Sequence, residues 1–247
     1  MILLDLIKID KRFNSHKSDQ IFMAILDLIK NKVIKNCDIL PNPADLANHL
    51  NLCVCHVEEA YKLLAEYHYI KKENENYIIY NFEINSNLFT HHGDLEETII
   101  SAGKTPSTQL LYAKNFKTDE KFYEQSKYEK NEQIFEIKHL FCGDGIPVFI
   151  VYTYISLTRF PDFKEIFIDT PPFSEAFNAH YNFIDVHSLR HIKVIPMPQK
   201  ESKLLNELPG TAVYMGACYF YDENEKQVGY LEIITSSHFS FTFDIPI

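Results

Sequence analysis

Glycine is scarce in this sequence, with seven residues in a chain of 247. So little glycine leaves little room for the glycine-rich loops that cradle nucleotide phosphates. Gly103, Lys104 and Thr105 match the end of such a loop, but its first glycine would fall at Thr98. Gly103 is better interpreted as the end of a helix, with Pro106 shortly after it. The sequence therefore predicts no cofactor.

Cysteine is also sparse, and its five positions (37, 53, 55, 142 and 218) are scattered. An odd number without regular spacing argues against a disulfide framework and favours reduced thiols in a cytoplasm. Cys53, Cys55 and His56 lie close together, but a structural zinc site needs four ligands and no second Cys/His cluster follows at a compatible spacing. We predict no metal site and a cytoplasmic location.

Long apolar runs are absent, because charged residues interrupt every apolar stretch before it reaches the length of a membrane span. The first ten residues include Asp5 within their apolar run and lack the small residues of a signal cleavage site. We therefore expect no membrane partner. Hydrophobic residues still make up 46% of the chain, which is enough for one large core or two modest ones.

Positive charge is in deficit, with a formal net charge of −10. This weighs against simple binding to nucleic acids, since affinity for phosphates comes largely from Lys and Arg. The deficit is uneven: residues 1–82 carry 10 Lys and Arg against 11 Asp and Glu, whereas residues 83–247 carry 14 against 23. Only the N-terminal part is electrostatically compatible with DNA.

Hydrophobic periodicity indicates three helices in residues 1–82. Apolar residues recur at helical spacing over positions 20–29, and again after Asn42 and Pro43, which are typical of a helix cap and first helical residue. A third helix follows Asn51, with these residues on its buried side: Val57, Ala60, Tyr61 and Leu64. Residues 71–76 are polar and residues 77–82 favour a strand. This order predicts a winged helix-turn-helix.

The remainder predicts an α+β domain with an antiparallel sheet. Residues 134–141 and 148–155 are β-prone runs joined across Asp144 and Gly145, which is a hairpin signal. Residues 213–221 and 227–235 form a second such pair, and residues 239–245 add a last strand. Short helices are expected near residues 94–102, 173–180 and 200–208, and residues 83–92 are expected to be a linker.

Taken together, the chain resembles the HutC-like branch of the GntR family of transcriptional regulators, which carry a C-terminal UTRA effector-binding domain. In the first part the resemblance rests on IFMAILDLI, LPNPADLANHLNL and VEEAYKLLAEYHYI. In the second it rests on LEETIISAGKTPST, GDGIPVFIVYTYI and the stretch from AVYMGACYFYD to the final FTF. The resemblance implies a DNA-binding domain over residues 1–82, a linker over 83–92, and a chorismate-lyase-like UTRA domain for effector binding and dimerisation over 93–247.

The surface that this resemblance assigns to DNA departs from the family. Cations usual in the second and third helices are replaced by Ala44, Val54 and Glu58, which removes expected contacts to phosphates and base edges. The wing glycines become asparagines, a mild change because Asn tolerates left-handed backbone conformations. The residues left to bind operator DNA are His56, Lys62, Lys71, Lys72, Asn74 and Asn76.

The effector site that the resemblance implies is also altered. The family commonly has an arginine pair and two acids where this chain has His139, Phe141, Val151 and Gly229. Without those charges the usual phosphosugar chemistry is not expected, and a less charged, more aromatic pocket is predicted. The histidines can alternatively be packing residues. The predicted effector contacts are Thr90, His91, His139, Phe141, Tyr154, Tyr230 and His238.

Three interpretations stay open at this point. The resemblance implies a dimeric repressor whose binding to double-stranded operator DNA changes when a small-molecule effector binds. The lost arginines leave the alternative of a degenerate ligand receptor or protein-interaction module. An enzyme on a chorismate-lyase-like fold is the third interpretation, but no arrangement of nucleophile and base is identifiable, so we predict no catalytic residues.

Overall fold

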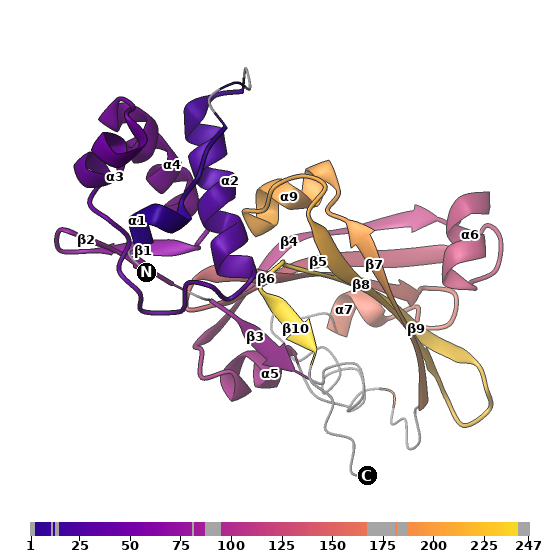
Figure 1. The fold of residues 1–247 in the computed structure, drawn as a ribbon. Helices are drawn as coiled ribbons and strands as arrows, with labels where there is room; N and C mark the ends of the chain where they lie inside the picture. The colour runs from indigo at the N-terminus through magenta and orange to yellow at the C-terminus, as the bar shows by residue number, and fades with distance from the viewer. Residues whose placement is uncertain are drawn as a thin grey trace, which may run out of the picture. The chain divides into compact units, whose positions relative to one another are not determined.

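The computed structural model describes residues 3–10, 12, 15–80, 82–86, 95–166, 181 and 187–241. The chain divides into two compact units, Met1–Phe82 and Glu83–Ile247, whose elements are drawn in Figure 1. In this described part of the chain, every helix is too short or too polar to cross a membrane.

The N-terminal unit packs its helices around one apolar core. Its elements are α1 (Leu3–Leu6), α2 (Lys17–Lys30), α3 (Pro43–Leu50), α4 (Val54–Glu66), β1 (Ile70–Glu73) and β2 (Asn76–Ile79). The innermost side chains come from α2, α3 and α4: Ile21, Ile25, Leu46, Val57, Tyr61 and Leu64. The helical faces predicted from the sequence are confirmed, and α2 begins three residues earlier than the apolar period indicated.

The turn between α3 and α4 follows from local sequence chemistry. The side chain of Asn42 accepts a hydrogen bond from the backbone N–H of Ala44 at 2.9 Å, and Pro43 opens the helix as predicted. Asn51 ends α3 in the left-handed region with φ +52°. Only Leu52 and Cys53 then separate it from the first residue of α4, so α3 and α4 form a helix-turn-helix.

The hairpin β1–β2 is the wing of this unit. It pairs Ile70 with Ile79 at its base and Glu73 with Asn76 at its tip. Asn74 adopts φ +54° in the turn, which Asn tolerates better than most residues. The second asparagine, Asn76, lies instead within β2, so only one of the two former wing glycines occupies a left-handed position.

The C-terminal unit is built on a six-stranded antiparallel sheet, which confirms the predicted antiparallel arrangement. In chain order its strands are β4 (Pro106–Lys117), β5 (Gln133–Gly143), β6 (Ile146–Ser156), β7 (His187–Pro196), β8 (Ala212–Tyr221) and β9 (Gln227–Thr235). The spatial order is β4-β5-β6-β9-β8-β7. The two predicted hairpins are β5–β6 and β8–β9, whereas the sequence did not indicate β4 and β7. Asp144 and Gly145 turn the first hairpin with φ +53° and +78°, which explains the Asp-Gly pair.

Shorter elements complete this unit: β3 (Ile84–Ser86), β10 (Phe239–Phe241), α5 (Leu95–Ser101), α6 (Glu120–Ser126), α7 (Phe163–Ile166) and α9 (Gln199–Leu205). The linker expected over residues 83–92 is wrong at its start, because Ile84 is fully buried and its N–H bonds the His238 carbonyl at 2.8 Å. Strand β3 pairs in parallel with β10, which therefore lies outside the main sheet. The helix expected near residues 173–180 lies outside the described residues.

Different elements cover the two faces of the main sheet. On face A, Phe135, Ile137 and Ile155 pack against Phe160 and Phe163, the latter in α7. The opposite side, face B, is covered near one end by α6 and near the other by α9, as Figure 1 shows. Between these two helices face B carries charged and phenolic side chains, which form the candidate site of this unit.

Candidate functional site

Helix α4 turns its polar side to solvent. Glu58 and Lys62 are exposed and His56 is half-buried, whereas Val57 and Tyr61 on the other side are fully buried. The Tyr61 hydroxyl donates a hydrogen bond to the Pro41 carbonyl at 2.9 Å, which fixes the rotation of α4 relative to the preceding turn. The residues that the sequence assigned to DNA on this helix therefore face outward.

The two lysines of the wing are exposed, and each contacts a neighbouring side chain. Lys71 lies 2.6 Å from the Glu73 carboxylate and 5.1 Å from the centre of the Tyr80 ring. Lys72 lies 5.5 Å from the centre of the Tyr77 ring. Exposed ion pairs contribute little to stability, so Lys71 can exchange Glu73 for a phosphate at small cost.

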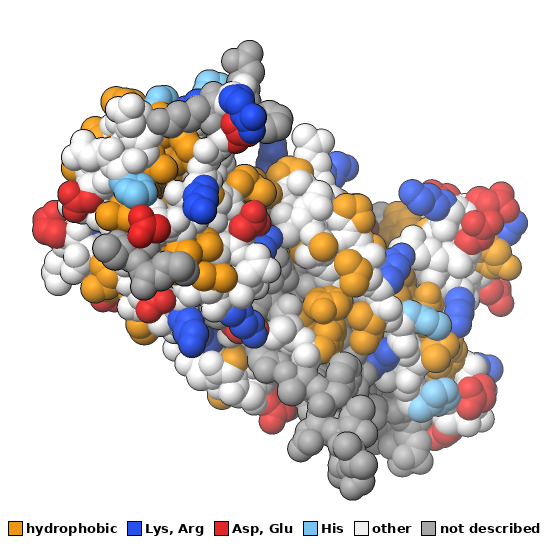
Figure 2. Space-filling view, in the orientation of Figure 1, with side chains coloured by type: hydrophobic (Ala, Val, Ile, Leu, Met, Phe, Trp, Pro, Cys, Tyr) orange, Lys and Arg blue, Asp and Glu red, His pale blue; other side chains and the backbone are white. Residues whose placement is uncertain are grey.

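Charges of both signs mix on the N-terminal unit. On the side visible in Figure 2, Lys and Arg side chains are interspersed with Asp and Glu rather than gathered in one patch. This agrees with the near-balance of 10 cations and 11 acids in residues 1–82. Any nucleic-acid contact of this unit thus depends on a few placed lysines rather than on a broad positive field.

Face B of the C-terminal sheet buries charged groups in pairs. Glu136 on β5 accepts a hydrogen bond from the Tyr112 hydroxyl at 2.6 Å and lies 3.1 Å from Lys114. Lys138, two residues along β5, lies 3.5 Å from Glu201 on α9, and both side chains are buried. A buried charge is costly unless it is paired and hydrogen-bonded, and these contacts supply the partners.

A third carboxylate, that of Glu232 on β9, is surrounded by neutral donors. The Tyr230 hydroxyl donates to it at 2.7 Å, the Tyr154 hydroxyl lies 3.5 Å away, and the Gln125 amide also donates to it. The Tyr154 and Tyr230 rings stack with their centres 5.4 Å apart. The Tyr219 ring stacks on Tyr230 in turn, with their centres 4.9 Å apart. These contacts join α6 to the middle of the sheet.

The phenols of this network are held in the protonated form. Burial comes first, and the neighbouring glutamates second, in raising the pKa of each of four side chains: Tyr112, Tyr152, Tyr154 and Tyr230. Their hydroxyls therefore act as hydrogen-bond donors at neutral pH. The Tyr152 hydroxyl uses its proton in a 2.6 Å bond to Glu201.

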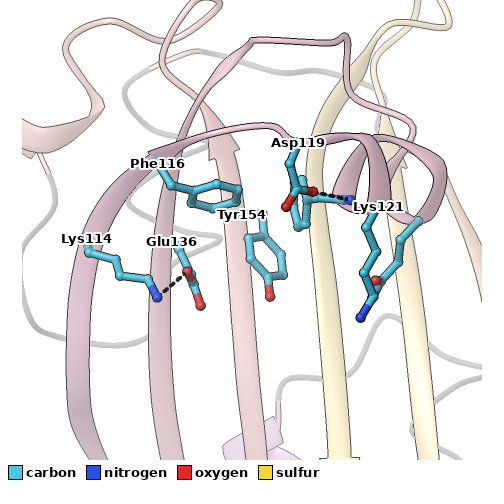
Figure 3. A pocket seen from close by; sticks show the side chains of 8 residues that line it. Lys114, Phe116, Asp119, Lys121, Glu136 and Tyr154 are labelled. Carbon is cyan, nitrogen blue, oxygen red and sulfur yellow. Dashed lines mark hydrogen bonds and ion pairs between the residues drawn. The ribbon is translucent and has the colours of Figure 1, made fainter.

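A pocket of about 410 Å³ opens beside the network, within the size range of sites for small ligands. Figure 3 shows Lys114, Phe116, Glu136 and Tyr154 on the sheet, with Asp119 and Lys121 on the side of α6. The complete lining is Lys114, Phe116, Asp119, Lys121, Phe122, Gln125, Glu136 and Tyr154. Its two lysines and two carboxylates cancel in formal charge, and three aromatic rings supply apolar wall.

The structure divides the residues expected to bind the effector between two faces. Tyr154 lines the pocket and Tyr230 stacks on it, both on face B. His139 and Phe141 lie on face A with ring centres 6.2 Å apart, because β5 alternates sides and residue 139 pairs with Val151 rather than with Tyr154. One pocket on the sheet therefore cannot contain all four side chains.

The remaining expected effector residues lie elsewhere. His238 is buried beside the β3–β10 pair, where its carbonyl accepts from Ile84. Thr90 and His91 lie outside the described residues. Within the described ranges, no group of three or more His, Cys, Asp or Glu side chains is arranged to hold a metal ion.

Sequence reasoning missed the charged residues of face B. Glu136 and Lys138 interrupt an apolar run at alternate positions, and this spacing places both on one side of a strand. Charged side chains inside an otherwise buried strand are unusual enough to mark a site. Glu201 and Glu232 gave no comparable signal. Glu201 reaches this face only because α9 packs on the sheet, and the neighbours of Glu232 depend on the position of β9 in the strand order.

A winged helix-turn-helix joined to an antiparallel-sheet unit with a polar pocket is the architecture of the GntR regulators that carry an effector domain. The family model of the UTRA domain matches residues 101–237, which is more than half of the chain. The chain belongs to the UTRA domain family.

Similar proteins extend this likeness over nearly the whole chain. The uncharacterized HTH-type transcriptional regulator YurK of Bacillus subtilis is 21% identical over 92% of this chain and 94% of its own. The probable fructoselysine utilization operon transcriptional repressor of Shigella flexneri is 21% identical over 85% and 86%. The crystal structure of PhnF from Mycobacterium smegmatis aligns with a TM-score of 0.58 at 15% identity, over 90% of this chain and 99% of that one.

Proposed function

We propose that this protein is a transcriptional repressor that binds operator DNA as a homodimer and responds to a small molecule held in the pocket on face B. The observation that carries the proposal is the outward-facing α4 of a winged helix-turn-helix, in a chain whose second unit is a UTRA domain. Relatives named as transcriptional regulators and repressors support it.

The hydrogen bonds of the carboxylates and phenols on face B favour a receptor over an enzyme. Glu136, Glu201 and Glu232 are each bonded to protein hydroxyl, ammonium or amide groups, and the raised pKa values of the surrounding tyrosines keep those hydroxyls protonated. A site in which carboxylates and phenols satisfy one another lacks the poised base that acid–base catalysis requires. We therefore assign binding and no catalytic step to the pocket.

Footprinting of the upstream region of the gene with the full chain tests the DNA-binding proposal. Two recognition helices of a dimer bind half-sites about one helical turn apart, so the proposal predicts a protected segment containing an inverted repeat. Scrambling one half-site should abolish protection of both halves at protein concentrations that saturate the intact site. A folded protein that protects nothing would favour the alternative of a receptor or protein-interaction module.

We propose that the ligand of this pocket is a neutral or zwitterionic polar molecule, because the lining carries no net formal charge. Lys114 is already paired with Glu136, and the lining adds one further lysine, Lys121, and one further carboxylate, that of Asp119, which accepts from the Phe122 N–H. Phe116 offers a flat apolar surface beside them, which suits the less polar side of a small metabolite. A ligand with a phosphate group would find no net positive charge among these lining residues.

Thermal-shift profiling with neutral, zwitterionic and phosphorylated sugars and amines checks this ligand class. We expect stabilisation by a neutral or zwitterionic compound, a smaller shift in Lys121→Ala, and an unchanged shift in Lys117→Ala. Lys117 is a suitable control because it is exposed at the end of β4 and is absent from the pocket lining. Stabilisation by phosphorylated sugars alone would contradict the assignment.

A further inference from the structure

Two thiols meet at the start of the helix that we assign to DNA. The Cys55 Sγ–H donates to Cys53 Sγ with the sulfur atoms 2.7 Å apart. Both cysteines are exposed to solvent. Neither the fold nor the DNA contacts described above make use of this pair, although it lies directly before His56.

The backbone explains how residues two apart bring their side chains together. Within a helix, residues i and i+2 point to different sides. Cys53, however, is the cap residue of α4, with an extended φ of −66° and ψ of 139°, and its side chain makes no capping hydrogen bond to the helix. Because Cys53 does not have helical backbone angles, its side chain does not follow the helical arrangement, and its sulfur lies against that of Cys55 in the first turn of α4.

The separation of the sulfurs distinguishes between two uses of a thiol pair. Two thiolates bound to one tetrahedral metal at about 2.3 Å each would lie about 3.8 Å apart. A disulfide bond brings the sulfurs to about 2.05 Å. The observed 2.7 Å is closer than a shared metal requires and approaches the bonded distance. This geometry favours bond formation between the sulfurs.

We propose that Cys53 and Cys55 form a reversible intramolecular disulfide when the protein meets a hydroperoxide such as hydrogen peroxide, and that this modification weakens DNA binding by α4. The effect on DNA rests on the proposed function, whereas disulfide formation does not. The hydrogen bond from the Cys55 thiol is the largest cause that holds the pKa of Cys53 below its ordinary value, against the opposing effects of burial and Glu58. Cys53 is therefore the attacking sulfur.

The reaction balances with the peroxide as the oxidant. The Cys53 thiolate attacks one peroxide oxygen, the O–O bond breaks, and the products are a sulfenic acid and, after protonation of the leaving oxygen, water. The Cys55 thiol then attacks the sulfenic sulfur, and the S–S bond forms as a second water leaves with the Cys55 proton. Two thiols and one hydrogen peroxide give one disulfide and two waters. A cellular thiol reverses the reaction by exchange.

The disulfide changes the first turn of α4 because it ties the cap residue to the second helical residue. His56 follows immediately and Glu58 lies one turn on, so the tie acts on the segment from which we expect base and phosphate contacts. Loss of one such contact corresponds to about a tenfold fall in affinity. The rest of the unit, anchored by buried Val57 and Tyr61, is expected to keep its fold.

The experiment treats the reduced full chain with stoichiometric hydrogen peroxide, alkylates free thiols under denaturing conditions, and maps the peptides by mass spectrometry. We expect a peptide containing both Cys53 and Cys55 that has lost two hydrogens, while Cys37, an exposed cysteine of the same unit, stays alkylated. The variant Cys55→Ser should instead accumulate a sulfenic acid at Cys53 that dimedone traps. DNA affinity is measured on the same samples by anisotropy, before and after reduction.

The expected result is about a tenfold loss of affinity on oxidation, restored by a dithiol and absent in Cys53→Ser, with Cys37→Ser behaving as the parent chain. Failure of the pair to oxidise before Cys37 would overturn the site itself. Disulfide formation with unchanged DNA affinity would overturn the switch. If the reduced chain binds no DNA, the proposed function fails, while the mass-spectrometric result still decides whether the disulfide forms.

Discussion

Glu58 lies on the exposed side of α4, where a helix that contacts DNA ordinarily carries positive or neutral groups. Its carboxylate repels phosphates, and the resemblance places a cation there in related regulators. On the proposed function, Lys62, Lys71 and Lys72 must therefore supply the electrostatic affinity for DNA. Position 58 reports directly on whether this side of α4 meets DNA.

Glu58→Arg should bind the operator more tightly, because it removes one repulsion and adds one phosphate partner. Each neutralised phosphate adds about 0.9 to the magnitude of the log–log salt slope, so the slope should steepen by about that amount. Fluorescence anisotropy over a salt series measures both quantities. The control is Glu124→Arg on α6, an exposed position with the same change of charge in the other unit. Equal behaviour of the two variants would show that α4 is not the DNA-binding face.

Asp222 illustrates how one buried carboxylate ties stability to pH. Burial alone would raise its pKa, but the Lys226 N–H, the Arg159 guanidinium and the Asn224 N–H together hold the pKa of Asp222 below its ordinary value. A depressed pKa contributes stability that is complete above the unfolded value near 3.8 and is lost as the pH falls through the folded value.

Asp222→Asn should therefore lower the free energy of unfolding at pH 7 by about 1.5 kcal/mol, the size of a hydrogen bond to a charged group. At pH 3 the difference between the variant and the parent chain should shrink. Urea unfolding at both pH values measures it. A difference that stays constant or grows toward acid would contradict the ionic role given to Asp222.

Among the elements, α9 is attached to the sheet by a charged contact inside an apolar cluster. Leu205 packs into the cluster that contains Leu140 and Ile150, while Glu201 reaches Lys138 at 3.5 Å and accepts from Tyr152. Replacing one member of a buried ion pair leaves the other charge without its partner. Removing either Lys138 or Glu201 should therefore weaken the packing of α9 on the strands that it covers.

Lys138→Met should lower the free energy of unfolding by about 3 kcal/mol, since Glu201 would then be buried with one hydroxyl donor only. Lys203→Met provides the control, because Lys203 is exposed on the same helix and surface changes usually stay within about 0.5 kcal/mol. Denaturant unfolding compares the two. Equal stabilities would mean that the pair contributes nothing to holding α9.

Elements with strong local signals were predictable from the sequence. Asn42 and Pro43 predicted the start of α3, and the Asp144-Gly145 pair predicted the β5–β6 hairpin. Strands β4 and β7 were missed because both are edge strands with many exposed positions, and β4 also shifts register between Leu110 and Tyr112. Edge strands do not show the continuous apolar run of a buried strand.

The candidate site was predictable only in part. Tyr154 and Tyr230 were identified, and the structure stacks them beside the pocket. His139 and Phe141 were grouped with them by resemblance, but grouping across strands requires the register, and the register places them on the other face. Glu201 reaches the site from a helix, and local sequence patterns carry no information about such long-range contacts.

For the assembled protein, β7 is the surface that we propose for pairing of two chains. Among the described strands it lies at the edge of the sheet, and it exposes three large apolar side chains: Leu189, Ile192 and Val194. Figure 2 shows hydrophobic side chains gathered on this part of the C-terminal unit. The other edge, β4, exposes mainly polar positions. An apolar exposed edge favours pairing with a second copy.

Val194→Lys should shift the protein from dimer to monomer and weaken operator binding, because a monomer engages one half-site at a time. Ala113→Lys, which introduces the same side chain at an exposed position of the opposite edge strand, is the control for dimerisation. Light scattering coupled to size-exclusion chromatography measures the mass of each variant. A dimer that survives Val194→Lys unchanged would place the interface elsewhere.

Binding of the purified chain to its own upstream DNA, compared with a scrambled duplex over a salt series, tests the central claim most directly. The account predicts selective binding. The logarithm of the association constant should fall linearly with the logarithm of the salt concentration, with a shallow slope set by the few lysines of α4 and the wing. A folded dimer that shows no selectivity at low salt, in its reduced form and without ligand, would contradict the assignment of this protein as a DNA-binding regulator.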